Sequence, residues 1–285
     1  MDFDGDGKND VISGSYPGEL YLFKGEGDGR FAHPEQIKHA DGRPVKVGLA
    51  AVAFAHDWDG DADLDLIVGD IEGRVHLVPN DGSKTRPAYG KATMIQAANA
   101  PVKVNGGDAG PTVADWDGDG NADLIVGTGS GGVVWFRNTG SPREPQLAAA
   151  QVLVADPGQE PAPAAPRRGS RAKVHAADWN ADGKLDLLVG DFVIRDAAPV
   201  ALPPEQEAAR NATREEWMKE YTALQQAPVD ETKEARQVRM KRIGDLIARF
   251  REMRGAQAAA AQEPASKYHG YVWVYLRQGG VARNE

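Results

Sequence analysis

Residues 115–123, Asp-Trp-Asp-Gly-Asp-Gly-Asn-Ala-Asp, are the clearest of four copies of one nine-residue pattern. The other copies are DFDGDGKND at 2–10, DWDGDADLD at 57–65 and DWNADGKLD at 178–186, so loops one to four begin at residues 2, 57, 115 and 178. Acidic or amide side chains recur at positions 1, 3, 5 and 9, and a tight turn would direct their oxygen atoms toward one point. Position 6 is glycine in three copies, which permits the positive φ of such a turn.

The loops carry more negative charge than a solvated turn needs. They hold 16 aspartates in 36 residues, and two carboxylates about 4 Å apart repel by about 4 kcal/mol at an effective dielectric constant of about 20. One DG-rich stretch could be an ordinary turn, but four copies in the same frame favour a site for a hard cation. Donors that are all oxygen are typical of Ca²⁺ rather than zinc or copper.

We therefore expect up to four bound Ca²⁺ ions. Side chains at positions 1, 3, 5 and 9 and the backbone carbonyl at position 7 would hold each ion. The candidate metal-binding residues are Asp2, Asp4, Asp6, Lys8, Asp10, Asp57, Asp59, Asp61, Asp63, Asp65, Asp115, Asp117, Asp119, Asn121, Asp123, Asp178, Asn180, Asp182, Lys184 and Asp186.

The four loops are not expected to bind the cation equally. Ala62 stands at position 6 of loop two, where a left-handed backbone would cost about 1 kcal/mol or more without glycine. Asn180 at position 3 lowers the ligand charge of loop four. Loops one and three are therefore expected to bind Ca²⁺ most tightly.

Each loop is followed by a short apolar run that ends in glycine, such as Leu-Ile-Val-Gly at 124–127, which is typical of a buried strand. An EF-hand would need flanking helices and a glutamate at position 12, which is instead Ser13, Val68, Val126 or Val189. The loop starts at 2, 57, 115 and 178 are 55, 58 and 63 residues apart. This period fits one four-stranded propeller blade.

The acidic loop, the apolar run with its glycine and a second strand ending near Asn-Gly or Lys-Gly resemble the FG-GAP, or VCBS-type, repeat of integrin-α-like β-propellers. The resemblance implies an all-β fold, a partial β-propeller of about four four-stranded antiparallel blades over residues 1–194 and 269–285. Both ends of the sequence are expected to fall within a blade, as in a fragment of a longer propeller. This fold serves adhesion receptors, lectins, lyases and scaffolds, so it does not identify the function.

Residues 195–268 interrupt the repeat between the second and third strands of the last blade. Pro203-Pro204-Glu205 is a helix-start signature, and Trp217, Tyr221 and Leu224 then recur at helical spacing. A second run places Val238, Leu246 and other apolar residues on one helix face. We expect an inserted α-helical hairpin on the face of the blade opposite the acidic loops.

Composition excludes several classes of function. The net charge of −9 argues against non-specific binding to nucleic acid. The sequence contains no run of 18 apolar residues, so no membrane span is expected. The absence of cysteine excludes disulfides and thiol chemistry. Met1 directly precedes the first loop, so no signal peptide is expected within this sequence. Neither a P-loop, a Rossmann fingerprint, a HExxH motif nor a nucleophile elbow is present.

The sequence therefore favours a calcium-stabilised binding or interaction module that is secreted, periplasmic or at the cell surface. Family resemblance implies a protein or carbohydrate partner, with structural calcium and no catalysis. One alternative is a polysaccharide lyase or hydrolase, which a deep pocket of His, Lys, Arg or Tyr on the face away from the loops would favour. Another is a purely structural repeat. The oligomeric state stays open.

Overall fold

The computed structural model describes residues 1–159, 168–195 and 267–277, together with short helical runs between 211 and 249. The chain packs as two units, one of Met1–Val193 and His269–Glu285, the other of Ile194–Tyr268. The described strands all belong to antiparallel sheets, apart from a few isolated bridges. Among the described residues, no helix has the length and apolar character needed to cross a lipid bilayer.

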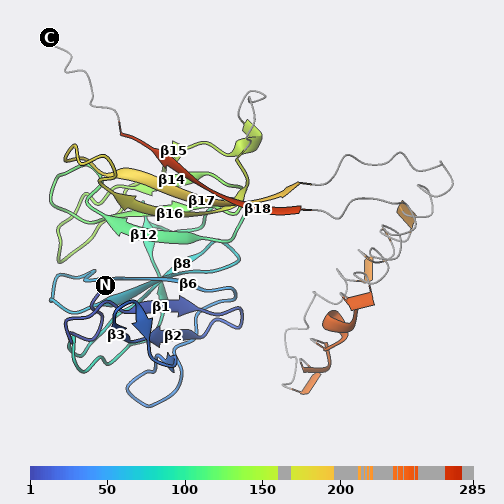
Figure 1. Cartoon of the computed structure of the whole chain (residues 1–285), viewed down its shortest axis with the longest axis horizontal. Coiled ribbons are helices and arrows are strands. Elements are labelled where there is room, and N and C mark those ends of the chain that lie inside the picture. The colour runs from blue at the N-terminus through green and yellow to red at the C-terminus, as the bar shows by residue number, and fades with distance from the viewer. Residues whose placement is uncertain are drawn as a thin grey trace, which may run out of the picture. The chain divides into compact units, whose positions relative to one another are not determined.

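Four sheets form the blades of a partial β-propeller and stand side by side in chain order (Figure 1). Blade one contains β1 (Val11–Gly14), β2 (Leu20–Phe23) and β5 (Glu35–Gln36). Blade two contains β6 (Val52–His56), β7 (Asp65–Gly69), β8 (Val75–Val78) and β9 (Thr93–Met94). Blade three contains β12 (Gly110–Ala114), β13 (Asp123–Gly127), β14 (Val133–Phe136) and β15 (Gln151–Val154). Blade four contains β16 (Ser170–Ala177), β17 (Asp186–Arg195) and β18 (Lys267–Tyr275).

The remaining elements are small hairpins and one turn of 3₁₀ helix. They are β3 (Gly25–Gly27) with β4 (Arg30–Phe31), β10 (Gln96–Ala97) with β11 (Ala100–Pro101), and η1 (Pro157–Gln159). The predicted fold class is confirmed. In blades one and two the outermost strands, β5 and β9, are only two residues long, and β5 pairs with β2. Outer strands lie at a sheet edge, where backbone groups can bond to water and pairing is less strongly favoured.

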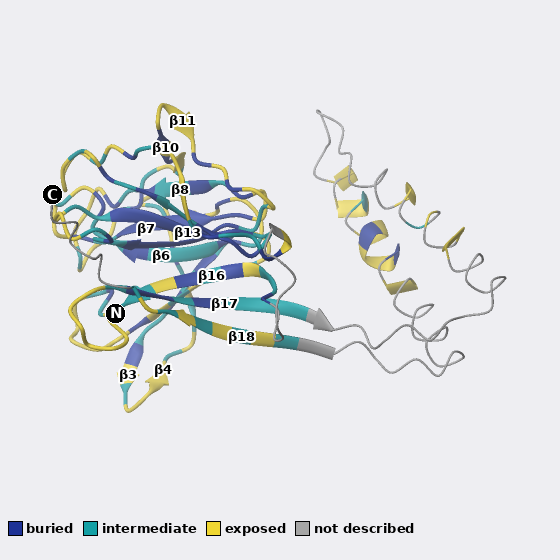
Figure 2. Cartoon of the chain, turned by 90° about the horizontal axis from the view of Figure 1, so that it is seen from above, coloured by how far each residue is buried: buried dark blue, intermediate teal, exposed yellow. Residues whose placement is uncertain are grey.

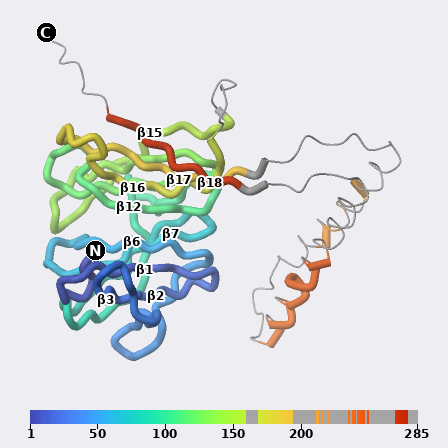
Figure 3. Tube along the Cα trace, viewed as in Figure 1, coloured from blue at the N-terminus to red at the C-terminus, as the bar shows by residue number. Residues whose placement is uncertain are grey.

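The same strand register recurs in three blades. His56 pairs with Asp65 at the loop end of β6 and β7, and Ala114 and Ala177 pair in the same way with Asp123 and Asp186. Each acidic loop therefore joins the first strand of a blade to its second strand at the same end. In blade four, β17 then pairs with β18 although residues 196–266 lie between them in sequence (Figure 3).

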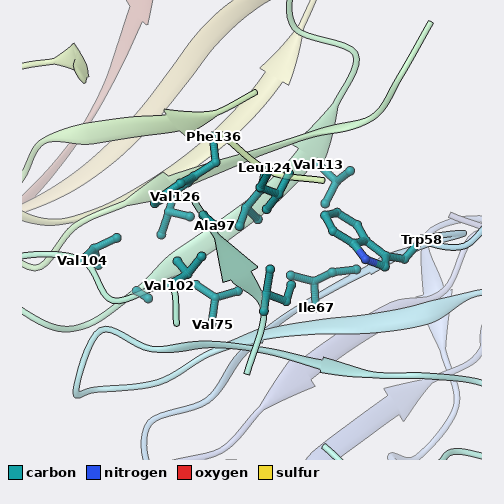
Figure 4. Close-up of a cluster of buried hydrophobic side chains, with 13 residues drawn as sticks. Trp58, Ile67, Val75, Ala97, Val102, Val104, Val113, Leu124, Val126 and Phe136 are labelled. Carbon is teal, nitrogen blue, oxygen red and sulfur yellow. The ribbon is translucent and has the colours of Figure 1, made fainter. Parts of the chain in front are cut away.

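The hydrophobic core is divided into three clusters, one between each pair of consecutive blades. Figure 4 shows the cluster between blades two and three, where Trp58 and Ile67 meet Leu124 and Val126. Equivalent clusters lie between blades one and two and between blades three and four. Figure 2 shows that the second strands β7 and β13 are buried, which explains why they read as unbroken apolar runs and not as alternating strands.

Glycine ends the second strand because the next blade approaches it closely. A Cβ atom on Gly69 would lie 2.3 Å from the carbonyl oxygen of Ala109, and one on Gly127 would lie 2.2 Å from that of Ala172. Both carbonyls belong to the segment that opens the following blade. A larger residue would push the blades apart at their inner edge.

The outward face of blade four departs from this pattern. The aromatic residue at loop position 2 is 8 % exposed for Trp116 but 61 % exposed for Trp179. On the third strand, Val133 of blade three is fully buried, whereas the equivalent Val272 is 69 % exposed. A Cβ on Gly190 would meet only the carbonyl oxygen of Lys173, at 3.7 Å. Among the described residues, no further blade covers this face.

The described part of the second unit is helical at positions between 211 and 220 and between 234 and 249. Trp217 donates a hydrogen bond from its Nε1 to the carbonyl oxygen of Leu246, at 3.2 Å, and Leu246 and Ile243 are buried. Val238 is exposed and does not share that buried position. Tyr221, Leu224 and Phe250 lie outside the described residues, and the expected placement of the hairpin relative to the blades stays a prediction.

Because Trp116 is buried and Trp179 is exposed, truncation to alanine should lower the free energy of unfolding much more at Trp116 than at Trp179. Trp116→Ala should lower the free energy of unfolding by about 3–5 kcal/mol, because it leaves a cavity between blades three and four. Trp179→Ala should change it by about 0.5 kcal/mol or less, because the side chain is exposed. Urea unfolding of both variants checks this, and equal losses would contradict the described packing.

Candidate metal-binding loops

The aspartate at position 9 is the structural anchor of each loop. In loop three, Asp123 is fully buried, and its Oδ2 accepts the backbone N–H of Trp116 at 3.1 Å. Its Oδ1 accepts the backbone N–H of Asn138, at the end of the third strand, at 2.6 Å. Asp10, Asp65 and Asp186 make the same two contacts in their own loops, at 2.7–3.1 Å.

The aspartates at positions 1 and 5 fold the loop around themselves. Asp115 accepts backbone N–H groups from positions 4, 5 and 6, at 2.8–3.0 Å. Asp119 accepts the N–H of position 7 at 2.9 Å. Positions 4 and 6 have positive φ, and the alanines found there obey the same rule, with φ of 58° at Ala181 and 76° at Ala62. Loop two therefore carries the backbone strain that its alanine predicted.

Three of the loops gather three carboxylates that could share one ion. One ligand atom from each residue lies within 4.8 Å of the others in the sets Asp2, Asp4 and Asp6, then Asp57, Asp59 and Asp61, and finally Asp115, Asp117 and Asp123. The predicted residues at positions 1 and 3 thus come together in these loops, joined by position 5 or position 9.

Loop four and position 7 differ from this arrangement. Asn180 takes position 3 of loop four and donates from its side-chain amide to Asp182, at 3.0 Å. Position 7 holds Lys8 and Lys184 in loops one and four, so only its backbone carbonyl could serve an ion there. In loop three it is Asn121, whose side-chain amide oxygen is a further possible donor. In loop two it is Asp63, which is 4 % exposed and whose Oδ1 has no hydrogen-bond partner.

Electrostatics set loop two apart from the others. Burial and then the nearby carboxylates of Asp61 and Asp65 raise the pKa of Asp63 to about 6. Burial also raises the pKa of Asp65 to about 6 and that of Asp59 above its usual value. In the part of the chain that the structure describes, no ion pair involves a carboxylate of loop two, whereas Arg137 and several lysines pair with those of loops three and one.

These donor sets suit a hard divalent cation. The ligands are oxygen atoms, they are gathered within one short loop, and in loop two their charge is not balanced by any described basic group. Carboxylate and carbonyl oxygens are the donors that Ca²⁺ takes, and its flexible coordination number tolerates the difference between loops. Side chains at positions 1, 3 and 5 would hold the ion, and the buried Asp63 would complete its surroundings in loop two.

A second set of polar anchors, which the sequence reading missed, lies at the opposite end of the blades. Asp70, directly after Gly69, accepts the backbone N–H of Arg74 at 3.0 Å and is paired with its guanidinium at 2.7 Å. Asp191 accepts the N–H of Tyr271 at 3.2 Å and the indole N–H of Trp273 at 2.7 Å. A polar residue after the strand-ending glycine was the signal that could have identified them.

One open hollow lies beside blades one and two, with a volume of about 860 Å³. Its floor includes the buried Val45 and Tyr89, and Nδ1 of His39 lies 2.9 Å from the carbonyl oxygen of Tyr89. Burial raises the pKa of Tyr89, whose hydroxyl donates to the carbonyl of Leu64 at 3.5 Å. The charged side chains at the hollow are Glu19, His39, Asp41, Arg43, Lys46 and Lys91.

The two kinds of loop aspartate should behave differently when no metal is present. Asp123→Ala removes the acceptor of two backbone N–H groups and should cost about 2–6 kcal/mol of unfolding free energy in chelator, at about 1–3 kcal/mol for each orphaned group. Asp119→Ala, at an exposed position, should cost about 1 kcal/mol or less. Urea unfolding in EGTA measures both, and a larger loss for Asp119→Ala would overturn the anchor role.

Comparison with known proteins gives a family match and one sequence relative. A model described as an FG-GAP-like repeat matches residues 2–55, 57–126 and 115–189. Cartilage acidic protein 1 of Mus musculus is 31 % identical over 133 residues, a segment that covers 45 % of this chain and 20 % of that protein. The chain thus spans about a fifth of the length of this curated relative.

Two solved structures show lower similarity. A Tc holotoxin pore of Photorhabdus luminescens has a TM-score of 0.37 and 18 % identity, covering 64 % of this chain and 8 % of that one. An Agrocybe aegerita lectin that recognises non-reducing terminal N-acetylglucosamine has a TM-score of 0.34 and 17 % identity, covering 67 % and 61 %. Neither similarity supports an argument about function. The repeat model matches more than half of the chain, and with the loops and blades described above it shows that the chain belongs to the FG-GAP-like repeat family.

Proposed function

We propose that this chain is a calcium-stabilised β-propeller module that binds a protein or carbohydrate partner outside the cytosol. The observation that carries the calcium part is loop two, where Asp63 is buried with an unpartnered carboxylate oxygen beside the gathered carboxylates of Asp57, Asp59 and Asp61. Leaving such charges uncompensated in a folded protein is costly. A bound Ca²⁺ would remove that cost and so favour the folded blade.

The proposed role of calcium is structural. The backbone N–H of position 2 bonds the aspartate at position 9, and the side chain of position 2 lies between two blades, as for Trp58. An ion that holds the loop would therefore also hold the aromatic wedge in place. Extracellular calcium-binding modules have Ca²⁺ dissociation constants of roughly 10⁻⁴ to 10⁻³ M. Such loops fill outside the cell and stay empty in the cytosol, which supports a secreted, periplasmic or surface location.

The hollow beside blades one and two is the part of the described surface that best suits a partner. Among its charged groups, Lys46 and Lys91 make no described ion pair, while Arg43 pairs with Asp41 at 2.7 Å. Two uncommitted lysines on an otherwise acidic protein favour a partner that carries carboxylates, such as an acidic glycan or an acidic protein segment.

The alternative of a polysaccharide lyase or hydrolase is less well supported by this hollow. A base and an acid would need to lie within reach of one another and of substrate. The hydroxyl of Tyr89 is buried and bonded to a backbone carbonyl, and Glu19 accepts a hydrogen bond from Tyr21 at 3.2 Å. In the described residues, no carboxylate forms a hydrogen bond or ion pair with His39, although Asp41 is near enough to interact with it electrostatically. The site fits binding better than catalysis.

Chelation should destabilise the protein. A ligand present at about 100 times its dissociation constant stabilises the folded state by about 2.7 kcal/mol, so Ca²⁺ should raise the melting temperature by roughly 5–10 °C over EGTA. Differential scanning fluorimetry in Ca²⁺ and in EGTA measures this shift in melting temperature. Asp59→Asn combined with Asp61→Asn should remove most of the shift, and an unchanged melting temperature in EGTA would refute structural calcium.

Binding and lyase activity make different predictions for acidic polysaccharide. The chain should bind an oligouronate without forming the ultraviolet-absorbing unsaturated uronate that a lyase produces. Lys46→Ala with Lys91→Ala should weaken binding roughly tenfold, equal to about 1.4 kcal/mol, while the exposed Lys103→Ala serves as the control. Titration calorimetry and an absorbance assay test both points. Formation of the unsaturated product would favour the lyase. If the double lysine variant bound oligouronate as tightly as the parent protein, the partner site would lie outside this hollow.

A further inference from the structure

We propose that the residue ending the third strand of each blade decides how strongly the adjacent acidic loop binds Ca²⁺. A basic residue there serves as a built-in cation, and loop two, whose blade has proline instead, is the strongest Ca²⁺ site of the chain. The inference rests on the proposed calcium function and deepens it, because it names the residues that set the affinity of each loop.

The four positions are structurally equivalent. In each blade, Oδ1 of the position 9 aspartate accepts the N–H of one residue just after the third strand, which is Gly25, Asn80, Asn138 or Arg277. The residue before it therefore stands at the same place beside the loop in all four blades. These residues are Lys24, Pro79, Arg137 and Leu276.

Arg137 neutralises part of the charge of loop three. Its Nε lies 2.5 Å from Asp117 Oδ2, and its Nη2 lies 3.0 Å from Asp119 Oδ2. These are positions 3 and 5, two of the carboxylates that an ion in this loop would use. One planar guanidinium thus forms ion pairs with two of the prospective metal ligands. It stays protonated at any physiological pH. Calcium would have to displace it, which lowers the affinity of loop three.

Loop one is neutralised less firmly. Lys24 pairs with Asp4 at 3.4 Å, and Lys84, which blade two supplies, pairs with Asp2 at 3.3 Å. Lys8 of the loop itself pairs with Asp6 at 3.6 Å. Each lysine pairs with one carboxylate of the loop, and a hydrated ammonium on a flexible stem competes less well than a guanidinium held at two carboxylates.

Loop two has no such cation. Pro79 carries no charge, and the stem of Arg143 passes beside Gly60 without forming an ion pair in the described part of the chain. The five aspartates of this loop include Asp63, with its buried and unpartnered oxygen. Blade four also lacks a basic residue at the end of its third strand, since Leu276 stands at the equivalent place. Its loop nevertheless carries less negative charge, because Asn180 replaces an aspartate and Lys184 lies within the loop.

This assignment reverses the order expected from the loops alone. Loops one and three were expected to bind most tightly because loop two has Ala62 at position 6 and loop four has Asn180 at position 3. That comparison counted ligands and omitted the cations that folding brings to them from the third strand. Strain at Ala62 costs about 1 kcal/mol, which is smaller than the effect expected from an unbalanced cluster of carboxylates.

The test uses the full chain, stripped of metal and titrated with Ca²⁺ in a calorimeter. The tightest site of the parent protein should be lost in Asp59→Asn with Asp61→Asn and kept in Asp117→Asn with Asp119→Asn. Arg137→Gln should tighten the loop three site about tenfold, because one competing charge is removed. Arg137→Lys should change it less, and Arg143→Gln, which removes an arginine that makes no ion pair, is the matched control.

Melting temperatures separate this role from a merely structural one. In EGTA, Arg137→Gln should melt below the parent protein, and saturating Ca²⁺ should abolish this difference in melting temperature. A structural arginine would lower the melting temperature equally in both conditions. The reverse graft, Pro79→Arg, should weaken the loop two site about tenfold, and the Arg137 variants decide the matter alone if the graft does not fold.

Three results would overturn the inference. The first is a parent protein whose tightest site is lost with Asp117→Asn and Asp119→Asn. The second is an Arg137→Gln variant that binds Ca²⁺ like the parent while the parent does bind it, in which case the proposed calcium role survives and the built-in cation does not. The third is the absence of any Ca²⁺ binding in parent and variants, which refutes both proposals together.

Discussion

The hydrogen bonds of the position 9 aspartate hold each blade together. Asp10, Asp65, Asp123 and Asp186 are all buried, and each accepts one N–H from the start of its own loop and one from the end of the third strand. One carboxylate thus ties together three segments of a blade. In blade four the bond from Asp186 reaches Arg277, 91 residues along the chain. Together with the bonds from Asp191 to Tyr271 and Trp273, it closes both ends of the β17–β18 pair. Because closing a longer loop costs little additional entropy, this pairing explains how blade four can carry a long insertion.

Much of the fold could be predicted from sequence because its signals are local and repeated. The loop, the apolar strand and the terminal glycine occur within about fifteen consecutive residues, and four copies in one frame established the period. The outer strands escaped prediction because edge pairing depends on neighbours and water more than on residue type. In blade one, for example, the outer strand is only Glu35–Gln36, which pairs with β2.

The candidate metal site was predicted less completely than the fold. The carboxylates at positions 1 and 3 do gather in three loops, since a tight turn directs alternating side chains inward. The sequence pattern could not show that Asp123 already bonds two backbone N–H groups, because its partner Asn138 is 15 residues away. Nor could it show that Arg137 lies against Asp117 and Asp119, since nothing within the loop indicates which distant base will approach it. Charge balance at a site is a property of the folded chain, whereas ligand spacing is a property of the sequence.

The residue at loop position 2 couples each acidic loop to the packing between two blades. The backbone N–H of Trp116 bonds Asp123 within the loop, while its side chain lies in the cluster between blades three and four. Phe3 and Trp58 make the same connection in their blades. A change in loop charge therefore acts on the packing of the next blade and not on the loop alone.

The stability of a repeat protein is approximately a sum of the stability of each repeat and of the interfaces between neighbouring repeats, and each loop contributes to both. Trp179 has the same bond to Asp186 but an exposed side chain, so its loop can contribute only to blade four itself in the described structure. The strength of coupling between cation and fold should thus differ among the loops for two separate reasons, the built-in base beside the carboxylates and the blade that covers the aromatic wedge.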